Sequence, residues 1–252
     1  MQDIFAEDTG NGTPLVLVHG FLGSSEMWSP QINFFKDNFR VIAPALPGFG
    51  KSSTIKPCNT IECMAKSILN FLDKEGIENF YLLGHSMGGM VVQEMVKIAA
   101  EKILKLVCYG TGPRGNIPGR FETIDQSRKQ LKINGLKDTA YRIAKTWFIE
   151  EEKAKYFYLC EEAGKQTSVE AADKGLVAMK KWDGIKNLKN IKNETLIVWG
   201  DQDRAYNLSQ VETLKKNIPN SNLKVVKNCS HNVHLENPDE FNIIVEEFLK
   251  KK

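Results

Sequence analysis

The chain has 252 residues, which is enough for one α/β domain with insertions and short for two independent cores. Hydrophobic residues make up 42% and charged residues 26%, the balance of an ordinary globular protein. The formal net charge of +3 is spread along the chain, so nucleic acid and anionic membranes are not expected as partners. No apolar run approaches the roughly 20 residues of a membrane-spanning helix, and no signal-peptide pattern opens the chain.

The cysteines are odd in number, and no two of them have the CxxC spacing. This pattern indicates neither a zinc site nor a disulfide framework. We therefore expect each cysteine to be a small buried side chain in a protein of the reducing cytoplasm. The five are Cys58, Cys63, Cys108, Cys160 and Cys229.

Short apolar segments bounded by turn residues are typical of buried strands, and they recur along the chain. They cover residues 15–18, 41–43, 80–83, 104–109, 195–199 and 223–226. Helical periodicity lies between them at 61–72, 87–100 and 211–218. A last helix is predicted over 240–249, with Asn237 as its N-cap and Pro238 in its first turn. Strands that alternate with helices predict a mostly parallel sheet with helices on both faces.

The alternation breaks once, after Gly110. The next convincing strand begins at Thr195, about eighty residues later, which is far longer than an ordinary connection. Helical patterns occupy this gap at 121–133, 138–148 and 153–163. We therefore predict a core formed by residues 1–110 and 191–252, and a helical cap inserted between them at 111–190.

One serine follows a predicted strand and begins a helix at once, in the sequence Gly84-His85-Ser86-Met87-Gly88. Parallel sheets bind ligands beyond the carboxyl ends of their strands, and Ser86 lies at such an end. A sharp turn from strand to helix would project its hydroxyl into that crevice, and small residues at 84 and 88 would let the backbones approach. The alternative is an N-cap serine in a glycine-rich turn; we favour a nucleophile.

A serine nucleophile needs an adjacent base, and the chain has only four histidines. His231 lies in the loop between the strand at 223–226 and the last helix, at the same edge of the sheet as Ser86. We therefore predict His231 as the base. We interpret His234 as a structural residue, and we expect His85 to line the pocket.

The base needs an acceptor that fixes its tautomer and stabilises the imidazolium. Asp201 and Asp203 both follow the predicted strand at 195–199, again at its carboxyl end. On position alone, either aspartate could serve. With either aspartate, the three residues follow one another along the chain as serine, aspartate and histidine, an order known from serine hydrolases.

Five motifs follow one another at compatible distances: LVHGF (17–21), PGFGKS (47–52), GHSMGG (84–89), GDQD (200–203) and SHNVHLENP (230–238). Together they resemble the α/β-hydrolase superfamily, in its branch with a serine nucleophile and a helical cap. The resemblance implies a mostly parallel central sheet flanked by helices, with an inserted helical cap. It selects Asp203 over Asp201 as the acid and supports His231 as the base. It also implies that the amide of Phe21 joins that of Met87 in holding the oxyanion.

We therefore predict a cytoplasmic serine hydrolase that cleaves a small or medium carboxylic ester or lactone through an acyl-enzyme on Ser86. This chemistry requires no metal and no organic cofactor. Apolar and aromatic side chains are expected to form the substrate pocket. The candidates are Leu22, Trp28, His85, Trp147 and Phe148.

Three alternatives stay open. A C–C bond hydrolase would also use a serine, although segment 20–25 lacks the additional Gly-Pro-Gly often seen in meta-cleavage enzymes. Segments 20–25 and 231–238 are similar to those of the menaquinone-pathway SHCHC synthase, a lyase. In that case Arg114, Arg120 and Arg128 could hold a polyanionic substrate, although we interpret them as surface residues. A ligand receptor could retain the triad. The natural substrate and the oligomeric state, a homo-oligomer included, are not determined by the sequence.

Overall fold

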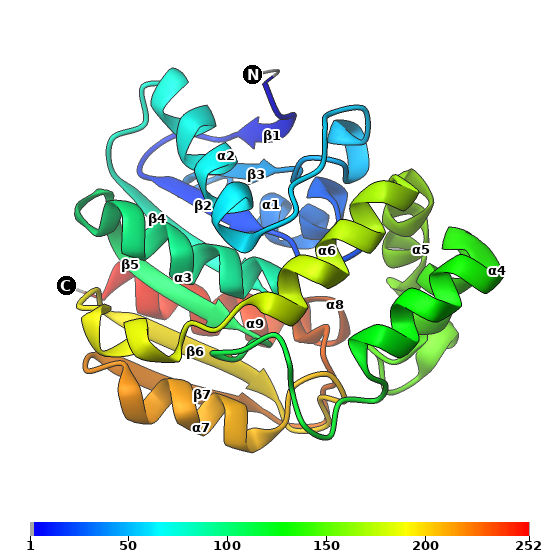
Figure 1. Cartoon of the computed structure of the whole chain (residues 1–252). Helices are drawn as coiled ribbons and strands as arrows, with labels where there is room; N and C mark the ends of the chain where they lie inside the picture. The colour runs from blue at the N-terminus through cyan, green and yellow to red at the C-terminus, as the bar shows by residue number, and fades with distance from the viewer. Residues whose placement is uncertain (1–2, 252) are drawn as a thin grey trace.

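One sheet forms the centre of the molecule (Figure 1). A computed structural model describes residues 3–251, and within this range seven strands pair in the order β1-β3-β2-β4-β5-β6-β7. Only β1 is antiparallel to its neighbour. The mostly parallel sheet predicted from the sequence is therefore confirmed. The strands are β1 (Ala6–Thr9), β2 (Pro14–Val18), β3 (Arg40–Pro44), β4 (Phe80–His85), β5 (Ile103–Tyr109), β6 (Thr195–Gly200) and β7 (Ser221–Val226).

Strand β4 is placed so that its carboxyl end emerges near the middle of the sheet edge. It lies between β2 and β5, with Val18 opposite Gly84 and His85 opposite Tyr109. All six predicted strands are present. Strand β1 is the one that the sequence did not predict. Its four residues have no apolar run, and it lies half-exposed at the edge of the sheet, where little burial is required.

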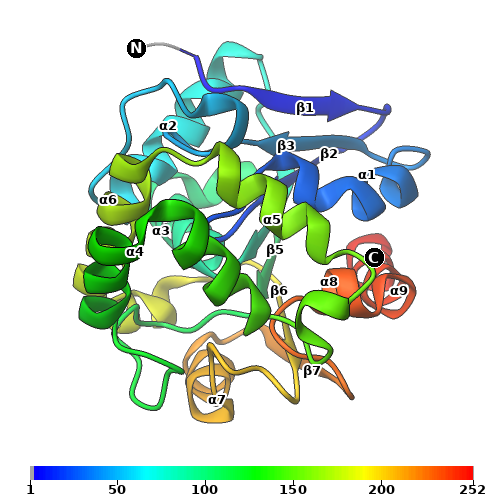
Figure 2. The same cartoon turned by 90° about the vertical axis from the view of Figure 1, so that its right-hand side faces the viewer.

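Helices cover both faces of the sheet (Figures 1 and 2). Along β2, Val16 and Val18 pack into the core on the face covered by α2, α3 and α7, while Leu15 and Leu17 face α1 and α9. The helices are α1 (Ser29–Phe35), α2 (Ile61–Lys74), α3 (Met87–Ala99), α7 (Leu208–Asn217), α8 (Val233–Glu236) and α9 (Pro238–Lys250). The predicted N-cap is also present, since Asn237 accepts a hydrogen bond from the amide of Glu240. Across the described range, the helices lack the length and apolarity that a bilayer crossing needs.

Between β5 and β6 the chain leaves the sheet and forms α4 (Ile124–Lys145), α5 (Phe157–Gln166) and α6 (Val169–Lys181). These helices gather beyond the carboxyl ends of the strands (Figures 1 and 2). Helix α4 is interrupted at Gly135, which separates the helical patterns predicted at 121–133 and 138–148. Helix α6 lies outside the predicted segments, because its buried face contains small residues such as Ala171 and Gly175 and gives a weak apolar signal. We propose residues 111–190 as a cap over this edge of the sheet.

Cys58 and Cys63 form a disulfide, which corrects the expectation that all five cysteines are unpaired. The N-cap residue Thr60 accepts a hydrogen bond from the amide of Cys63, and the segment before it folds back on the first turn of α2. The two Cα atoms are therefore 5.6 Å apart. With a disulfide present, cysteine use no longer supports a reducing cytoplasm. The remaining cysteines are free and buried, as expected: Cys108, Cys160 and Cys229.

Candidate active site

Ser86 lies in a strained turn between β4 and α3. Its φ of 58° and ψ of −117° are rare for a residue with a side chain and cost about 1–3 kcal/mol. A Cβ on Gly84 would lie 2.3 Å from the carbonyl oxygen of Gly88, and a Cβ on Gly88 would lie 2.3 Å from that of Val18. Both glycines are therefore required by close backbone contacts, as the sequence predicted.

His231 and Asp203 form a buried pair at the carboxyl edge of the sheet. His231 Nδ1 lies 2.9 Å from Asp203 Oδ2, and the two side chains are 1% and 0% exposed. Asp203 Oδ1 accepts hydrogen bonds from the backbone amides of Ala205 and Tyr206, at 2.7 and 3.0 Å. Because both carboxylate oxygens are acceptors, Nδ1 must carry the imidazole hydrogen. The neutral ring therefore keeps Nε2 as an acceptor, which is the form that a general base needs.

Asp201 lies apart from this pair. Its carboxylate is 3.5 Å from the Nζ of Lys227, an exposed side chain. Within residues 3–251, no hydrogen bond or ion pair joins Asp201 to His231. Asp203 is thus the aspartate that reaches the imidazole, in agreement with what the resemblance implies.

Two buried side chains hold the backbone of His231. The hydroxyl of Tyr109 donates to the His231 carbonyl oxygen at 2.9 Å, and His85 Nε2 lies 3.2 Å from the same oxygen. The His85 and Tyr109 rings are stacked, with centroids 4.5 Å apart. Burial, together with nearby His231 and His234, lowers the pKa of His85 well below its ordinary value. His85 is therefore neutral and can donate a hydrogen bond from Nε2 to the His231 carbonyl oxygen, which helps to fix the backbone of the base.

Ser86 and His231 open onto one small cavity of about 20 Å³. In the described chain no hydrogen bond joins Ser86 Oγ to His231 Nε2; such bonds often shorten only when substrate is bound. A space of this size holds about one water molecule, so substrate entry requires side chains of the wall to move. The rest of the wall is formed by Phe21, Gly115, Ile117, Arg120, Phe121, Ile143, Trp147, Met179, Ala205 and Tyr206.

Of the side chains predicted for the pocket, Trp147 lines this cavity, with its ring 6.2 Å from that of His231. Its carbonyl oxygen also accepts a hydrogen bond from the amide of Asn232, at 3.0 Å. The other four predicted side chains lie outside the wall of this cavity. They pack into the hydrophobic core or against the side of the base that faces away from the cavity. They are Leu22, Trp28, His85 and Phe148.

The two amides predicted to bind the oxyanion lie next to the serine. Met87 is the first residue of α3, so no carbonyl one turn earlier in the helix can accept from its N–H. Gly20, which precedes Phe21, is so close that an added Cβ would lie 3.0 Å from Ser86 Cβ. The Phe21 amide makes no backbone hydrogen bond within residues 3–251. Their role as oxyanion donors stays a prediction that this placement supports.

His19 fixes the loop that carries Phe21. Its Nδ1 lies 2.8 Å from the carbonyl oxygen of Gly20, and its Nε2 lies 3.0 Å from the amide nitrogen of Leu46. Because the Leu46 amide can only donate, Nε2 must be unprotonated, and Nδ1 carries the hydrogen. Burial lowers the pKa of His19 from 6.5 to about 4. Protonation of this ring would remove the bond to Leu46.

We therefore expect acid to destabilise the protein through His19. Its folded pKa lies below its unfolded value of 6.5, so the unfolded state binds more protons as the pH falls from 6.5 to about 4. The free energy of unfolding should fall across that window, by on the order of 3 kcal/mol from this residue. His234 acts in the same direction, because burial lowers its pKa to about 3. Urea unfolding at several pH values should show a flatter pH dependence for His19→Gln than for wild type; parallel curves would contradict this account.

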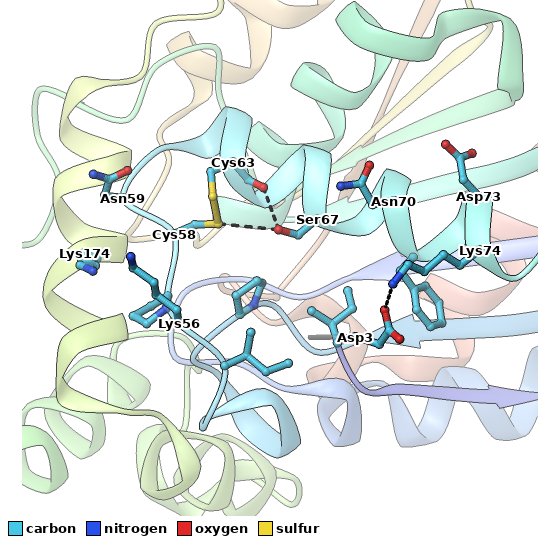
Figure 3. Close-up of a pocket in the computed structure, with 15 residues that line it drawn as sticks. Asp3, Lys56, Cys58, Asn59, Cys63, Ser67, Asn70, Asp73, Lys74 and Lys174 are labelled. Atoms are coloured by element: carbon cyan, nitrogen blue, oxygen red, sulfur yellow. Dashed lines mark hydrogen bonds and ion pairs between the residues drawn. A yellow bond between two sulfur atoms is a disulfide. The ribbon is translucent and has the colours of Figure 1, made fainter. Parts of the chain in front are cut away.

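A larger pocket, of about 770 Å³, lies beside the disulfide, between α2 and Lys174 of α6 (Figure 3). Two of its lysines are neutralised, since Lys74 pairs with Asp3 and Lys174 with Glu170. None of the described residues in its wall is one of the three predicted catalytic residues. The larger volume of this pocket is therefore no reason to place the reaction there.

Residues 13–238 match the family described as the alpha/beta hydrolase fold. The chain belongs to the α/β-hydrolase family. This hydrolase is 27% identical to a pimeloyl-[acyl-carrier protein] methyl ester esterase of Legionella pneumophila, over 99% of the chain and the whole of that protein. A solved thermophilic esterase from Thermogutta terrifontis superimposes on it with a TM-score of 0.87 at 25% identity, over 98% of this chain and 93% of the other.

Another relative is longer. The hydrolase is 26% identical to the dihydrolipoyllysine-residue acetyltransferase component of an acetoin cleaving system of Cupriavidus necator, over 97% of its own length and 66% of that protein. Relatives named for other activities, a dienedioate hydrolase and a chloroperoxidase among them, have identities of 29% and 28%. The comparisons therefore identify the family and the fold of this chain, and they do not identify its reaction.

Proposed function

We propose that this α/β-hydrolase is a carboxylic-ester hydrolase, which cleaves small or medium esters or lactones through an acyl-enzyme on Ser86. The observation that carries the proposal is the buried His231–Asp203 pair at the sheet edge where Ser86 turns out of β4. Ser86 and His231 face one cavity, so a carbonyl group placed there would meet both. Names of ester-cleaving relatives support the same reaction class.

In the acylation step, His231 Nε2 takes the proton of the Ser86 hydroxyl as Oγ attacks the carbonyl carbon of the ester. The carbonyl oxygen becomes negatively charged in the tetrahedral intermediate. We expect the amides of Phe21 and Met87 to donate to it, and the N-terminal end of α3 favours negative charge there. The bond to the leaving oxygen then breaks, and His231 gives its proton to the departing alcohol.

In the deacylation step, a water molecule takes the place of the alcohol. His231 Nε2 accepts a proton from this water as its oxygen attacks the acyl carbon. The second tetrahedral intermediate collapses, Ser86 recovers its proton from His231, and the carboxylic acid leaves. Asp203 stays ionised and holds the Nδ1–H throughout. The cycle uses the ester, water, these three side chains and the two backbone amides.

A serine-directed label tests this proposal. The wild type should hydrolyse p-nitrophenyl acetate or butyrate, and one equivalent of a fluorophosphonate should abolish the activity. Mass spectrometry should find the label on the peptide that contains Ser86. Labelling of another residue would contradict the proposed nucleophile. Negligible turnover of an ester and lactone panel, together with tight ligand binding, would support a receptor instead.

A further inference from the structure

The cavity that Ser86 and His231 share has one arginine and no lysine among the described residues of its wall; the arginine is Arg120, which precedes helix α4 in the cap segment. The chain has six arginines, and five of them form ion pairs with carboxylates. Among residues 3–251, Arg120 has no such partner. The five paired arginines are Arg40, Arg114, Arg128, Arg142 and Arg204.

This placement corrects the interpretation of all three cap arginines as surface residues. Arg114 pairs with Asp183 at 2.9 Å and Arg128 with Asp173 at 2.7 Å, which fits that interpretation for both. Arg120 differs, because it contributes to the same cavity wall as Ser86. A surface role therefore does not explain its position.

The guanidinium of Arg120 is held in place but has an unused donor. Its Nη1 is buried and has no hydrogen-bond partner in the described chain. Its Cζ lies 5.0 Å from the ring centroid of Phe121, so an aromatic face supports it. The nearby acid Glu122 is already engaged, since it accepts hydrogen bonds from Arg142 at 2.8 and 3.1 Å. A buried charged donor without a partner is costly, which indicates that a ligand supplies the acceptor.

Tyr206 lies in the same cavity wall as Arg120 and the base His231. The Tyr206 ring stacks on the His231 ring, with centroids 5.8 Å apart. Burial raises the pKa of Tyr206 to about 12, and the positive charge of Arg120 opposes that rise. Burial lowers the pKa of Arg120, and Tyr206 opposes that change in turn. An arginine nevertheless stays protonated at neutral pH.

We propose that Arg120 binds a free carboxylate of the substrate, so that the preferred substrate is an ester or lactone with a second, ionised carboxyl group. This inference rests on the proposed function, because the cavity is the one that Ser86 faces. The planar guanidinium can donate two parallel hydrogen bonds to a carboxylate. One guanidinium balances the single charge of a carboxylate, whereas a phosphate dianion would leave a charge against an apolar wall.

The same geometry disfavours uncharged esters. A neutral ester of similar size offers only a carbonyl oxygen to the buried Nη1 of Arg120, so the charge of the guanidinium would stay unbalanced and the charge-assisted pair of hydrogen bonds would be lost. We therefore expect the wild type to hydrolyse an anionic ester with a higher kcat/KM than its neutral counterpart.

Two matched pairs of esters test the inference. Monomethyl adipate and dimethyl adipate differ by a carboxylate on the acyl side. The acetate ester of 4-hydroxybenzoate and its methyl ester differ by a carboxylate on the alcohol side. In at least one pair, Arg120→Gln should lower the ratio of kcat/KM for the anionic over the neutral ester by about 10- to 100-fold. The pair that responds identifies the side on which the carboxylate binds.

Arg114→Gln is the matched control, because it removes the same charge from the same segment at an exposed ion pair. Its ratio should stay within about twofold of wild type. Arg120→Lys, which keeps the charge and loses the planar fork, should give an intermediate ratio. An unchanged ratio in Arg120→Gln, or an equal change in Arg114→Gln, would overturn the inference. Thermal unfolding of each variant checks that it is folded. If Arg120→Gln does not fold, the kcat/KM ratio of Arg120→Lys is compared with that of the wild type instead.

A binding experiment separates this inference from the proposed esterase activity. Adipate and hexanamide are titrated calorimetrically into Ser86→Ala and into Ser86→Ala/Arg120→Gln. Adipate should bind the single variant more tightly than hexanamide does, and loss of Arg120 should raise its Kd by about 10- to 100-fold. Such a result supports the carboxylate site even if no ester is hydrolysed. Equal Kd values in both proteins, or no binding of adipate, would overturn the site even in an active esterase.

Discussion

Ser86→Ala should lower kcat/KM by on the order of a million-fold for any ester that the wild type hydrolyses. The variant lacks the oxygen that forms the acyl-enzyme, and the methyl group of alanine cannot act as a nucleophile. The fold should persist, because the close backbone contacts of the turn depend on Gly84 and Gly88 and not on the serine hydroxyl. Steady-state hydrolysis of p-nitrophenyl butyrate and thermal unfolding of the same samples measure both expectations.

Ser67→Ala is the matched control for this substitution. Ser67 lies in α2 and donates to the carbonyl oxygen of Cys63, in the wall of the surface pocket beside the disulfide (Figure 3). Its loss should leave ester hydrolysis within about twofold of wild type, as for most substitutions away from a site. Residual activity above one part in a hundred in folded Ser86→Ala would mean that another group is the nucleophile.

Asp203→Asn should lower kcat by up to about ten-thousand-fold, as in other triads. The amides of Ala205 and Tyr206 would hold the remaining oxygen of the asparagine, at the position that Asp203 Oδ1 occupies. The NH2 group would then face His231 Nδ1, which has to become the acceptor. The imidazole hydrogen moves to Nε2, and the nitrogen toward the substrate can no longer accept a proton.

Asp201→Asn provides the comparison, two residues away in the same loop. Asp201 faces Lys227 near the surface, so its neutral variant should keep kcat within a few-fold of wild type. Kinetics of both variants on one ester, with circular dichroism to confirm folding, decide the assignment. Similar losses in both would show that Asp203 is not the specific partner of the base.

The sequence predicted those parts of the molecule whose signals are local. Buried strands such as β6 are continuous apolar runs between turn residues, and the turn at Ser86 needs glycines at fixed positions, so both can be found without coordinates. The choice between Asp201 and Asp203 came from family resemblance, and the structure gives its geometric reason: only Asp203 lies within hydrogen-bonding distance of His231.

The sequence could not predict features that arise when distant segments pack together. Tyr109 holds the carbonyl group of His231, a residue 122 positions away, and nothing local marks it for that role. The disulfide depends on how the chain folds back before α2, which the five-residue separation of its cysteines does not specify. Arg120 resembles any cap arginine until its missing partner and its place in the cavity are known. These are tertiary properties, and periodicity carries no information about them.

The hydrogen bond between the Trp147 carbonyl oxygen and the Asn232 amide has a consequence for how a substrate gains access. It fastens one end of the cap to the loop that carries the base, and the amide of Ile149 adds a second attachment through Glu236, at 2.6 Å. If this end swung outward, His231 would be pulled from its aspartate. Substrate entry should therefore depend on side chains of the cavity wall and not on displacement of the 147–149 backbone, because that displacement would disturb the base that the reaction needs.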